Sequence, residues 1–488
     1  MRLIAALLAA LTLPVVAACG GGEGPGGAAE AVPADVAFYV VADTDVESDQ
    51  WEAVQELAAS FPGGEDLTGR IVEELEAEGE LDFEEDVEPA LGPVVAFAVL
   101  GLEQDTEGSE PFVLLTQPED AAAFARLVER EPEPGVVREI DDWQVAAMSE
   151  DVLDRFEAAL DGGRLADSDG FQDAMDGLDE DGLVTFYGNL ARVEGAAEGA
   201  ASAQLDTFFP GGEAPVLGGT VRAEDDGARL DGRLVYAEEV EGSPFSVDPY
   251  EAELPGVVPG DVLAYVSFND LEQAISAYRD ALAEGEPELE SQLGMVEGLF
   301  GLSLEEDIAP LFAGEGAVYA RHGALIPEVT LVTRIEDEAA ALETLDGLVA
   351  RLGIYFPFAR PERTEVDGVE VREIALSAPF KLSYAAFDGL LVVTTSSEGI
   401  ADLREDEDRL ADADAFEEAL DRAGAPDETS GFAYVDLEEA LPLLFGLAEA
   451  GNEETEEARR YTDPLTSLVA WGEQDGDTQR FSLFVGIE

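Results

Sequence analysis

Few side chains in this sequence could take part in nucleophilic, redox or metal chemistry. The chain has 488 residues but one cysteine, Cys19, and one histidine, His322. A disulfide or a thiolate zinc site needs more cysteines, and a Cys-His or Ser-His-Asp set would have to use one of these two residues. The HExxH zinc motif needs two histidines. The composition therefore excludes most common catalytic sets.

The remaining reactive side chains lack partners at a suitable spacing. His322 follows an expected strand, where Arg321-His322-Gly323 predicts a turn; a polar turn residue is favoured, with an acid–base or metal-binding histidine as the alternative. The one lysine, Lys381, lies one residue too far from Ser377 for a Ser-x-x-Lys nucleophile. We expect it to mark a hairpin edge, where a lysine discourages strand addition. The sequence predicts no catalytic residue, no cofactor-binding residue and no metal ligand.

Acidic side chains dominate the composition. The chain has 110 aspartates and glutamates against 25 lysines and arginines, a formal net charge of −85. Such a surface repels nucleic acids and anionic lipids. The 46% hydrophobic content and the regular apolar periodicity nevertheless favour a packed core over disorder. We interpret the charge as a halophilic adaptation, because molar salt screens the self-repulsion.

Cation capture by acidic clusters is the alternative explanation of the charge. Asp179, Asp181 and Gly182 match the third, fifth and sixth positions of an EF-hand calcium loop. The first and twelfth positions would be Gly177 and Gly188, which have no side-chain oxygen to offer. This segment therefore does not predict a calcium site.

The N-terminal segment, residues 1–18, has the pattern of an export signal. An apolar run, residues 3–13, follows Arg2, and small residues precede Cys19. The run is shorter than the roughly 20 residues that a membrane-spanning helix needs, so we expect cleavage rather than anchoring by a helix. Val16-Ala17-Ala18-Cys19 resembles the bacterial lipobox, whose cysteine is lipidated. The resemblance implies lipid attachment at Cys19; a plain secretory signal is the alternative.

A lipid on Cys19 would decide where the protein resides. Two or three acyl chains make a stable anchor, because each buried methylene contributes about 0.8 kcal/mol. The expected location is therefore extracytoplasmic, with the protein attached to the cell membrane through this lipid. Residues 19–32 are rich in glycine and predict a flexible tether between the membrane and the folded body.

The rest of the chain predicts two tandem copies of one domain, residues 33–240 and 255–488. Short segments recur in the same order in both halves, which indicates duplication rather than chance. The recurring pairs are Pro33-Ala34-Asp35-Val36 with Pro259-Gly260-Asp261-Val262, Leu81-Asp82-Phe83-Glu84-Glu85-Asp86 with Leu302-Ser303-Leu304-Glu305-Glu306-Asp307, and Arg164-Leu165-Ala166-Asp167-Ser168-Asp169 with Arg409-Leu410-Ala411-Asp412-Ala413-Asp414.

Short strands alternate with helices in each copy, so the expected fold class is α+β. Polar two-residue turns such as Phe387-Asp388-Gly389-Leu390 predict antiparallel hairpins. We expect each copy to be a mostly antiparallel sheet with its helices packed on one face. A helix is predicted from about Asp49, with Glu52 completing an Asp-x-x-Glu cap.

Apolar residues are expected to serve the cores. Trp51, Trp143 and Trp471, with Phe61, Phe356 and Phe358, favour core packing, with a ligand cleft between the copies as the alternative. The apolar segment 440–447 predicts a buried helix rather than a docking surface.

Several features together resemble a family of bacterial lipoproteins that contain a domain of unknown function. These are the lipobox, the glycine tether, Pro33-Ala34-Asp35 before the first strand, and Asp43-Thr44-Asp45 running to Ser48-Asp49-Gln50-Trp51. The resemblance assigns a role to Cys19 alone. The leading hypothesis is a non-catalytic surface lipoprotein that binds a ligand or an envelope partner. The alternatives are a carboxylate-dependent extracellular hydrolase and an envelope scaffold or spacer.

Overall fold

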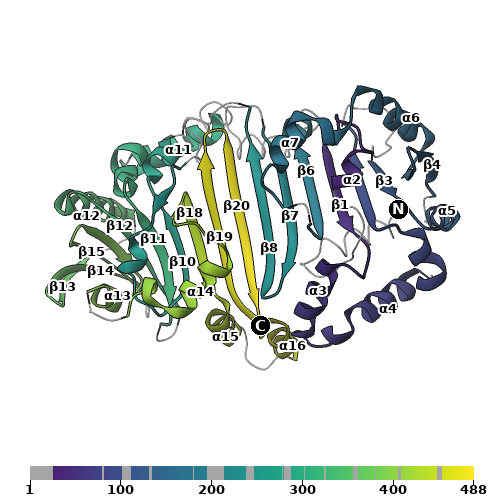
Figure 1. The fold of residues 1–488 in the computed structure, drawn as a ribbon. Coiled ribbons are helices and arrows are strands. Elements are labelled where there is room, and N and C mark those ends of the chain that lie inside the picture. The colour runs from purple at the N-terminus through teal and green to yellow at the C-terminus, as the bar shows by residue number, and fades with distance from the viewer. Residues whose placement is uncertain are drawn as a thin grey trace. The chain divides into compact units, whose positions relative to one another are not determined.

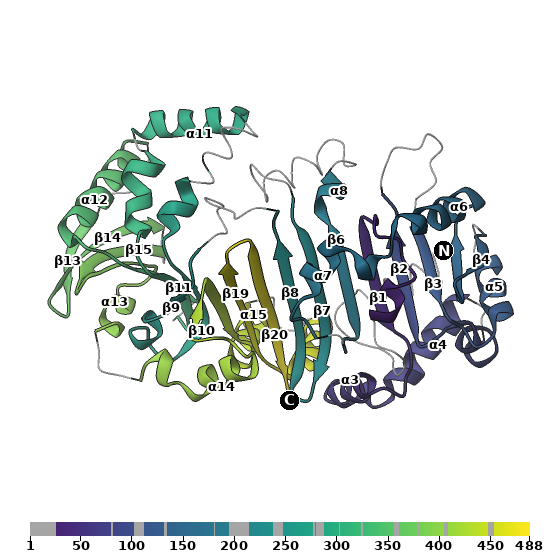
Figure 2. The ribbon, with the colours of Figure 1, turned by 45° about the horizontal axis from the view of Figure 1, so that its top comes forward.

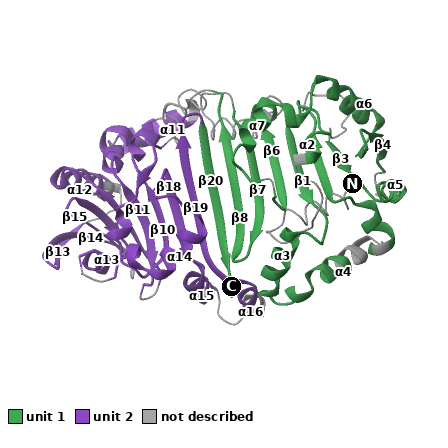
Figure 3. Ribbon diagram, viewed as in Figure 1, with its two compact units in different colours: residues 1–202, 213–238, 478–488 green, residues 203–212, 239–477 purple. Residues whose placement is uncertain are grey.

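The computed structural model consists of two compact α+β units (Figure 1, Figure 3). Unit 1 comprises Met1–Ser202, Glu213–Glu238 and Thr478–Glu488, and unit 2 comprises Ala203–Gly212 and Glu239–Asp477. The structure describes residues 26–79, 82–101, 112–130, 134–179, 181–194, 214–237, 247–276, 279, 287–301, 303–323, 326–355, 361–377, 380–404, 408–447 and 453–488.

The described part of unit 1 contains one antiparallel sheet with the strand order β4-β5-β3-β2-β1-β6-β7-β8-β20. The last strand, β20, comes from the end of the chain, within the range expected for the second copy. The strands are β1 (Phe38–Asp43), β2 (Val94–Val99), β3 (Phe112–Thr116), β4 (Val136–Ile140), β5 (Trp143–Ala147), β6 (Val184–Asn189), β7 (Val216–Glu224), β8 (Gly227–Val235) and β20 (Thr478–Ile487).

Helices cover both faces of the unit 1 sheet. On one face, α6 and α7 pack against β1, β2, β3 and β5 through Phe156 and Ala174. On the opposite face, α5 packs against Val95 and Leu114 through Phe124. The helices of unit 1 include α2 (Gly26–Ala29), α3 (Asp49–Ala59), α4 (Leu67–Gly79), α5 (Ala121–Arg130), α6 (Glu150–Ala159), α7 (Asp169–Met175) and α8 (Leu190–Glu194).

The expectation that the helices lie on one face is therefore wrong. Its physical reason lies in the strands: Val113, Leu114 and Leu115 of β3 are consecutive and all buried, as are Val145, Ala146 and Ala147 of β5. A strand with one solvent-exposed face would alternate apolar and polar residues. These continuous apolar runs bury both faces of the sheet.

Part of the expected tether packs inside unit 1. Ala28 and Ala29 of α2 and the following Ala31 and Val32 are at most 5% exposed, and they belong to the same core cluster as Tyr39. Small apolar side chains suit this close packing. The glycine-rich stretch that precedes them, together with Cys19, lies outside the described residues.

The described part of unit 2 contains an antiparallel sheet with the order β13-β14-β15-β16-β12-β11-β10-β18-β19. A separate ribbon pairs β9 (Tyr250–Glu251) with β17 (Glu428–Thr429). The sheet strands are β10 (Val262–Phe268), β11 (Gly316–Arg321), β12 (Glu328–Arg334), β13 (Glu362–Val366), β14 (Val369–Ser377), β15 (Phe380–Phe387), β16 (Leu390–Thr394), β18 (Gly431–Asp436) and β19 (Leu465–Asp475).

Unit 2 also has helices on both faces, and Figure 2 shows α12 on one side of the sheet with α13 and α14 on the other. Helix α12 packs on Tyr384 and Leu391, while Phe416 of α14 contacts Tyr265 from the opposite face. The helices of unit 2 include α11 (Pro287–Phe300), α12 (Glu338–Tyr355), α13 (Glu398–Asp402), α14 (Asp414–Arg422), α15 (Leu437–Leu447) and α16 (Glu453–Thr462).

Several local structures recur in the two units. Pro33 forms an isolated antiparallel bridge with Arg164 in unit 1, and Pro259 forms one with Arg409 in unit 2. A five-residue π-turn, Phe83–Val87 in one unit and Leu304–Ile308 in the other, is capped in each by the residue that precedes it.

An aromatic contact recurs as well. In unit 1, Phe171 of α7 lies edge-on to Tyr187, with ring centroids 5.5 Å apart. In unit 2, Phe416 of α14 lies edge-on to Tyr434 at 5.1 Å. In both units this ring holds a helix against the two central strands, β1 and β6 or β10 and β18.

Local signals in the sequence locate individual elements. Helix α3 begins at Asp49 as expected, but its cap is Ser48, whose hydroxyl accepts a hydrogen bond from Trp51 N. The expected hairpin joins β15 to β16, with Asp388 and Gly389 at positive φ, 52° and 76°. Glycine suits such a turn because it has no Cβ to clash in the left-handed region.

Candidate functional site

The face of the unit 2 sheet on which α14 packs carries a row of hydroxyl side chains. Tyr265, Tyr319, Thr330, Thr394 and Ser383 occupy neighbouring register positions on β10, β11, β12, β16 and β15. Each is at most 1% exposed. We call these five residues the polar row. Burying five hydroxyl groups on adjacent strands costs folding free energy unless each group has a hydrogen-bond partner.

The same row in unit 1 is almost entirely apolar. Its register runs through Tyr39, Ala98, Val113, Ala147 and Val136 on β1, β2, β3, β5 and β4. The tyrosine on the central strand is therefore shared, whereas the four other positions differ in polarity. The pattern of the fold does not require hydroxyls at these positions, so the polar row is a property of unit 2.

The polar row is only partly satisfied by hydrogen bonds. Thr330 Oγ1 donates to Thr394 Oγ1 at 2.8 Å, and the latter also accepts from Ser396 N at 3.3 Å. Among the described residues, Ser383 Oγ and the Tyr265 hydroxyl have no hydrogen-bond partner, whereas the Tyr319 hydroxyl interacts with Thr330. Buried polar atoms are nearly always bonded to protein, water or ligand, so these atoms mark a candidate binding site.

Two charged side chains lie at the start of β12 and the end of β11, next to the polar row. Arg321, 14% exposed, binds Asp261 through two nitrogens, at 2.6 and 2.9 Å, and Asp402 at 2.6 Å. Its register partner Glu328 is 9% exposed, and its Oε1 has no hydrogen-bond partner among the described residues.

Burial controls the titration of the site. It raises the pKa of Glu328, although Ser396 and Arg321 oppose the shift by stabilising the carboxylate. Burial likewise raises the pKa of the Tyr319 hydroxyl, and neighbouring Thr330 opposes that shift. Burial therefore disfavours the ionised forms of both side chains.

Burial also acts on a carboxyl in unit 1, at the end of β1. It raises the pKa of Asp43 from 3.8 to about 8, and the nearby charge of Asp45 adds to the shift while backbone N–H groups oppose it. Because the folded protein keeps a proton that the unfolded chain releases above about pH 4, folding loses stability as the pH rises toward 8.

We expect Asp43→Asn to be more stable than the wild-type protein at pH 9 and close to it at pH 4, because an amide does not ionise. Urea unfolding at both pH values, monitored by hydrogen exchange of unit 1, measures the difference in the free energy of unfolding between variant and wild type. Glu56→Gln on α3 is the matched control, since it removes one exposed carboxylate. A stability gain that is equal at both pH values would contradict the prediction.

The reactive residues singled out from the sequence do not converge on the polar row. Cys19 lies outside the described residues. The His322 side chain is 49% exposed and lies 3.5 Å from Glu439, consistent with a polar turn residue. Lys381 binds Glu373 at 2.7 Å on β15, which has β14 and β16 as neighbours; β15 is thus not an edge strand.

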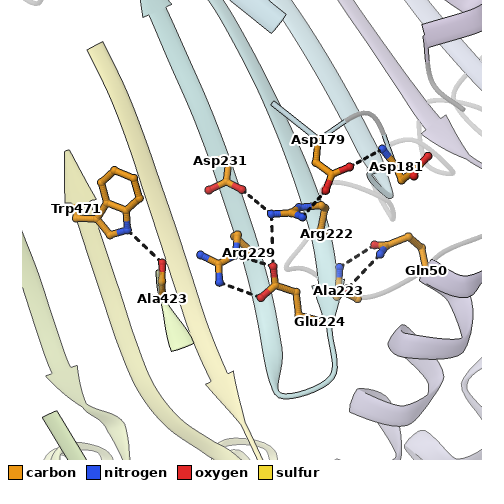
Figure 4. A network of polar contacts seen from close by, with 10 residues as sticks. All are labelled: Gln50, Asp179, Asp181, Arg222, Ala223, Glu224, Arg229, Asp231, Ala423 and Trp471. Atoms are coloured by element: carbon orange, nitrogen blue, oxygen red, sulfur yellow. Dashed lines mark hydrogen bonds and ion pairs between the residues drawn. The ribbon is translucent and has the colours of Figure 1, made fainter. Parts of the chain in front are cut away.

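Acidic side chains in the described part of the chain form ion pairs rather than metal clusters. No group of three or more Asp, Glu, His or Cys side chains there could hold a metal ion. Asp179, the EF-hand candidate, binds Arg222 at 2.7 Å, and Arg222 also binds Asp231 at 2.9 Å (Figure 4). With Arg229 bound to Glu224, these ion pairs join β7 to β8.

Core packing is expected for all three tryptophans, and the structure confirms it for Trp51 and Trp143. Trp51 and Trp143 are 2% and 7% exposed and belong to core clusters of unit 1. Trp471 is half-buried on β19 and donates to the Ala423 carbonyl (Figure 4). Segment 440–447 forms most of α15, but Leu444 is 56% exposed, so the expected buried helix is only partly buried. Phe356 and Phe358 lie outside the described residues.

Sequence reasoning did not find the polar row. Thr330 and Thr394 are ordinary strand residues in sequence, far apart along the chain, and Tyr319 follows an apolar run. The available signal was comparative: aligning the two halves would place Tyr319 against Ala98 and Thr330 against Val113. Only the register of the sheet makes them neighbours.

No helix in the described part of the chain is long and apolar enough to cross a membrane. A comparison with curated proteins finds no match. Two crystal forms of the protein TP0453 match at 14% sequence identity and a TM-score of 0.23. The match to form I covers 46% of this chain and 74% of the TP0453 chain. The match to form III covers 50% of this chain and 95% of the TP0453 chain.

A family model gives the stronger match. It is described as a protein of unknown function, DUF3352, and it matches residues 129–487, which include all of unit 2 with the polar row but less than half of unit 1. The chain therefore belongs to the DUF3352 family of proteins of unknown function.

Proposed function

We propose that this protein is exported, anchored to the cell membrane by a lipid on Cys19, and non-catalytic, with a duplicated body whose second unit binds a ligand. The observation that carries the binding function is the polar row. It stands where the first unit has an almost entirely apolar row, and among the described residues it leaves the Ser383 and Tyr265 hydroxyls without hydrogen-bond partners. A binding site of this kind needs no reactive side chain.

The duplication rests on shared topology. The order β15-β16-β12-β11-β10-β18-β19 in unit 2 follows the order β4-β5-β3-β2-β1-β6-β7 in unit 1, strand for strand in sequence. The hairpin β13–β14 extends the unit 2 sheet beyond this common part. The recurring proline bridges and π-turns occupy the same places in both orders. Gene duplication followed by divergence of one row explains both the likeness and the difference.

The anchor rests on the lipobox-like sequence, and the packing of α2 adds a consequence. Gly26, the first residue of α2, lies seven positions after Cys19 in the sequence. A fully extended chain of that length spans at most about 25 Å. Since Ala28 and Ala29 are buried in unit 1, a lipid on Cys19 would hold that unit close to the bilayer.

We expect Cys19→Ser to move the protein from the membrane fraction to the soluble extracytoplasmic fraction almost completely, because no acyl chain can then be attached. Membrane fractionation, with mass spectrometry of the N-terminal peptide, measures both location and modification. Adding Glu56→Cys to Cys19→Ser is the control, since a thiol elsewhere should not restore the anchor. Membrane retention of Cys19→Ser would contradict the proposed anchor.

The binding function has its own test. The full-length protein, purified from its host's membranes in high salt, is denatured, and released small molecules and co-purified proteins are analysed by mass spectrometry. A stoichiometric compound supports the binding function. Its absence, with a stoichiometric protein partner, would favour the envelope scaffold instead.

A carboxylate-dependent hydrolase is the second candidate. The specific observation in its favour is Glu328, whose pKa is raised by burial, as a general acid requires, with Asp402 contributing a second nearby charge. Hydrolysis of glycosides by purified protein that Glu328→Gln abolishes and Glu398→Gln leaves intact would favour this candidate over binding.

A further inference from the structure

We propose that two copies of this chain pair edge to edge through β13, the outer strand of the unit 2 sheet. This interface goes beyond the proposed ligand binding and does not depend on it. Among the described residues, β13 pairs with β14 alone, so its other edge is open. Figure 1 and Figure 2 both show β13 at the outer end of the sheet. An open edge presents backbone N–H and C=O groups that can bond to another strand.

The hairpin turn decides which backbone groups of β13 point outward. Asp367 and Gly368 join β13 to β14 at φ values of 48° and 82°, as a two-residue type I′ turn requires. In such a hairpin the two residues that flank the turn form a hydrogen-bonded pair, and hydrogen-bonded pairs then alternate along the strands. The N–H and C=O groups of Arg363 and Glu365 therefore point away from β14.

The charges of β13 favour a second copy of this chain as the strand that fits the open edge. Arg363 and Glu365 stand symmetrically about Thr364 and lie on the same face of the strand. In an antiparallel pair centred on Thr364, Arg363 lies opposite Glu365 of the second copy, and the two residues exchange both backbone hydrogen bonds. The symmetry repeats this pair on the other side of Thr364, so both arginines face a glutamate.

The other symmetric registers of β13 are unfavourable. Two opposite residues must both direct their backbone groups toward the partner strand or both away from it, so the symmetry axis passes through a residue. Centring the pair on Arg363 or on Glu365 places like charges directly opposite each other, which destabilises it. The register centred on Thr364 avoids this repulsion.

Contacts within the hairpin leave room for a partner. The Arg363 side chain is 67% exposed and lies 3.8 Å from Glu370 of β14, a long distance for an ion pair. Glu365 is exposed and is the register partner of Glu370, so a like charge stands opposite it within its own chain. A second copy would supply the arginine that the hairpin does not place opposite Glu365.

The outer strand of unit 1, β4, lacks this complementarity. Its charged residues Arg138 and Glu139 are adjacent in sequence and point to opposite faces, so no symmetric register places one opposite the other. Arg138 is also bound by Glu150, Asp154 and Glu157 of α6. In contrast, β13 has neither a proline nor a bulge against β14, two devices that commonly block an open edge.

The net charge of −85 opposes the association of two copies at low salt. At 1 M salt the Debye length falls to about 3 Å, so the repulsion between whole molecules is screened. Charges in direct contact across the two strands are screened less. Because one short strand buries little area, we expect a weak and reversible dimer in molar salt, whose formation depends on the charges at positions 363 and 365.

Disulfide trapping tests the register. Cys19 is the one cysteine of the chain, so Cys19→Ser gives a full-length background without thiols. In the proposed pair the two Thr364 residues face each other with Cα atoms about 4.5 Å apart, within the range that a disulfide bridges. We expect Thr364→Cys in this background to form a disulfide-linked dimer under mild oxidation in molar salt. Glu362→Cys, on the same face of the strand, is the matched control, because its two copies would lie about 14 Å apart.

Charge exchange tests the partner. In sedimentation equilibrium of the Cys19→Ser chain in molar salt, we expect Arg363→Glu and Glu365→Arg each to weaken self-association about tenfold or more, because each places like charges opposite one another. An equimolar mixture of these two variants should associate again, since every opposite pair then joins an arginine to a glutamate. Arg126→Glu on α5, where the side chain is 52% exposed, is the matched control for net charge.

A Thr364→Cys dimer, together with recovered association in the mixture, supports the proposal. Absence of association up to about 1 mM protein, association that the charge variants leave unchanged, or an equally efficient crosslink through Glu362→Cys would each overturn it. In an extract of the host, a crosslink from Thr364→Cys to a different protein would also overturn the second copy as the occupant of this edge.

Discussion

Asp346→Leu is expected to destabilise unit 2 by about 3 kcal/mol, at the lower end of the range for breaking a buried ion pair. Asp346 of α12 accepts from Arg372 Nε at 2.9 Å and from the Tyr384 hydroxyl at 2.8 Å. Arg372 and Tyr384 are 8% and 1% exposed. Among the described residues, the substitution leaves the buried guanidinium with Glu370, at 3.1 Å, as its one carboxylate partner, and it leaves the buried Tyr384 hydroxyl without its acceptor.

The reverse change should cost less. In Arg372→Met, the remaining Asp346 side chain is 34% exposed, so water can solvate it, and Tyr384 still donates to it. Methionine also keeps much of the apolar stem of arginine. We expect the double variant Asp346→Leu with Arg372→Met to recover part of the stability lost in Asp346→Leu, because no unpaired buried charge remains.

A double-mutant cycle measures this coupling. Hydrogen exchange followed by mass spectrometry reports the two units separately, with β14 and β15 as the reporting strands and unit 1 as an internal reference. A double variant whose loss equals the sum of the two single losses would show that the ion pair is not coupled, and equal losses in the two single variants would contradict the expected asymmetry.

The parts of the fold that local chemistry determines could be predicted. The Asp388-Gly389 turn needs two residues at positive φ, and the sequence supplies residue types that tolerate it. Helix α3 starts where an acidic first turn follows a capping serine, Ser48. The antiparallel character of both sheets follows from such hairpins.

Features that depend on burial of both strand faces were harder to predict. The runs Val113-Leu114-Leu115 and Val145-Ala146-Ala147 lack the alternation of a half-exposed strand, and this signal points to helices on both faces. Strand composition alone does not say which helix covers which face. The long-range pairing of β20 with β8 brings the end of the chain into unit 1 and leaves no local signal in either segment.

The candidate site could not be predicted for a related reason. Its residues come from β10, β11, β12, β15 and β16, and their adjacency depends on register, which a shift of one residue would destroy. Thr330 and Thr394 form a hydrogen bond across more than sixty positions of sequence. A threonine in a strand is common, and only its unexposed position beside other hydroxyls makes it unusual.

Gly218→Ala is the second large change, and we expect it to destabilise unit 1 by about 3 kcal/mol, the upper end of the usual range for overpacking. A Cβ atom at Gly218 on β7 would lie 2.3 Å from the Ala174 carbonyl oxygen and 2.8 Å from its carbonyl carbon. These are backbone atoms of the end of α7, so relief requires the whole helix end to move. Ala174 is fully buried, and α7 carries Phe171, whose ring packs on Tyr187.

Hydrogen exchange of β6 and β7 measures the loss, and Gly162→Ala provides the matched control in unit 1, because nothing lies within 4 Å of its Cβ position. The corresponding position in unit 2 carries a larger side chain. There Val469 is the register partner of Tyr434, as Gly218 is of Tyr187, and α14 packs beside its strand. A loss below about 1 kcal/mol in Gly218→Ala would therefore indicate that α7 can move outward to accommodate a side chain, and that the close approach is not needed for stability.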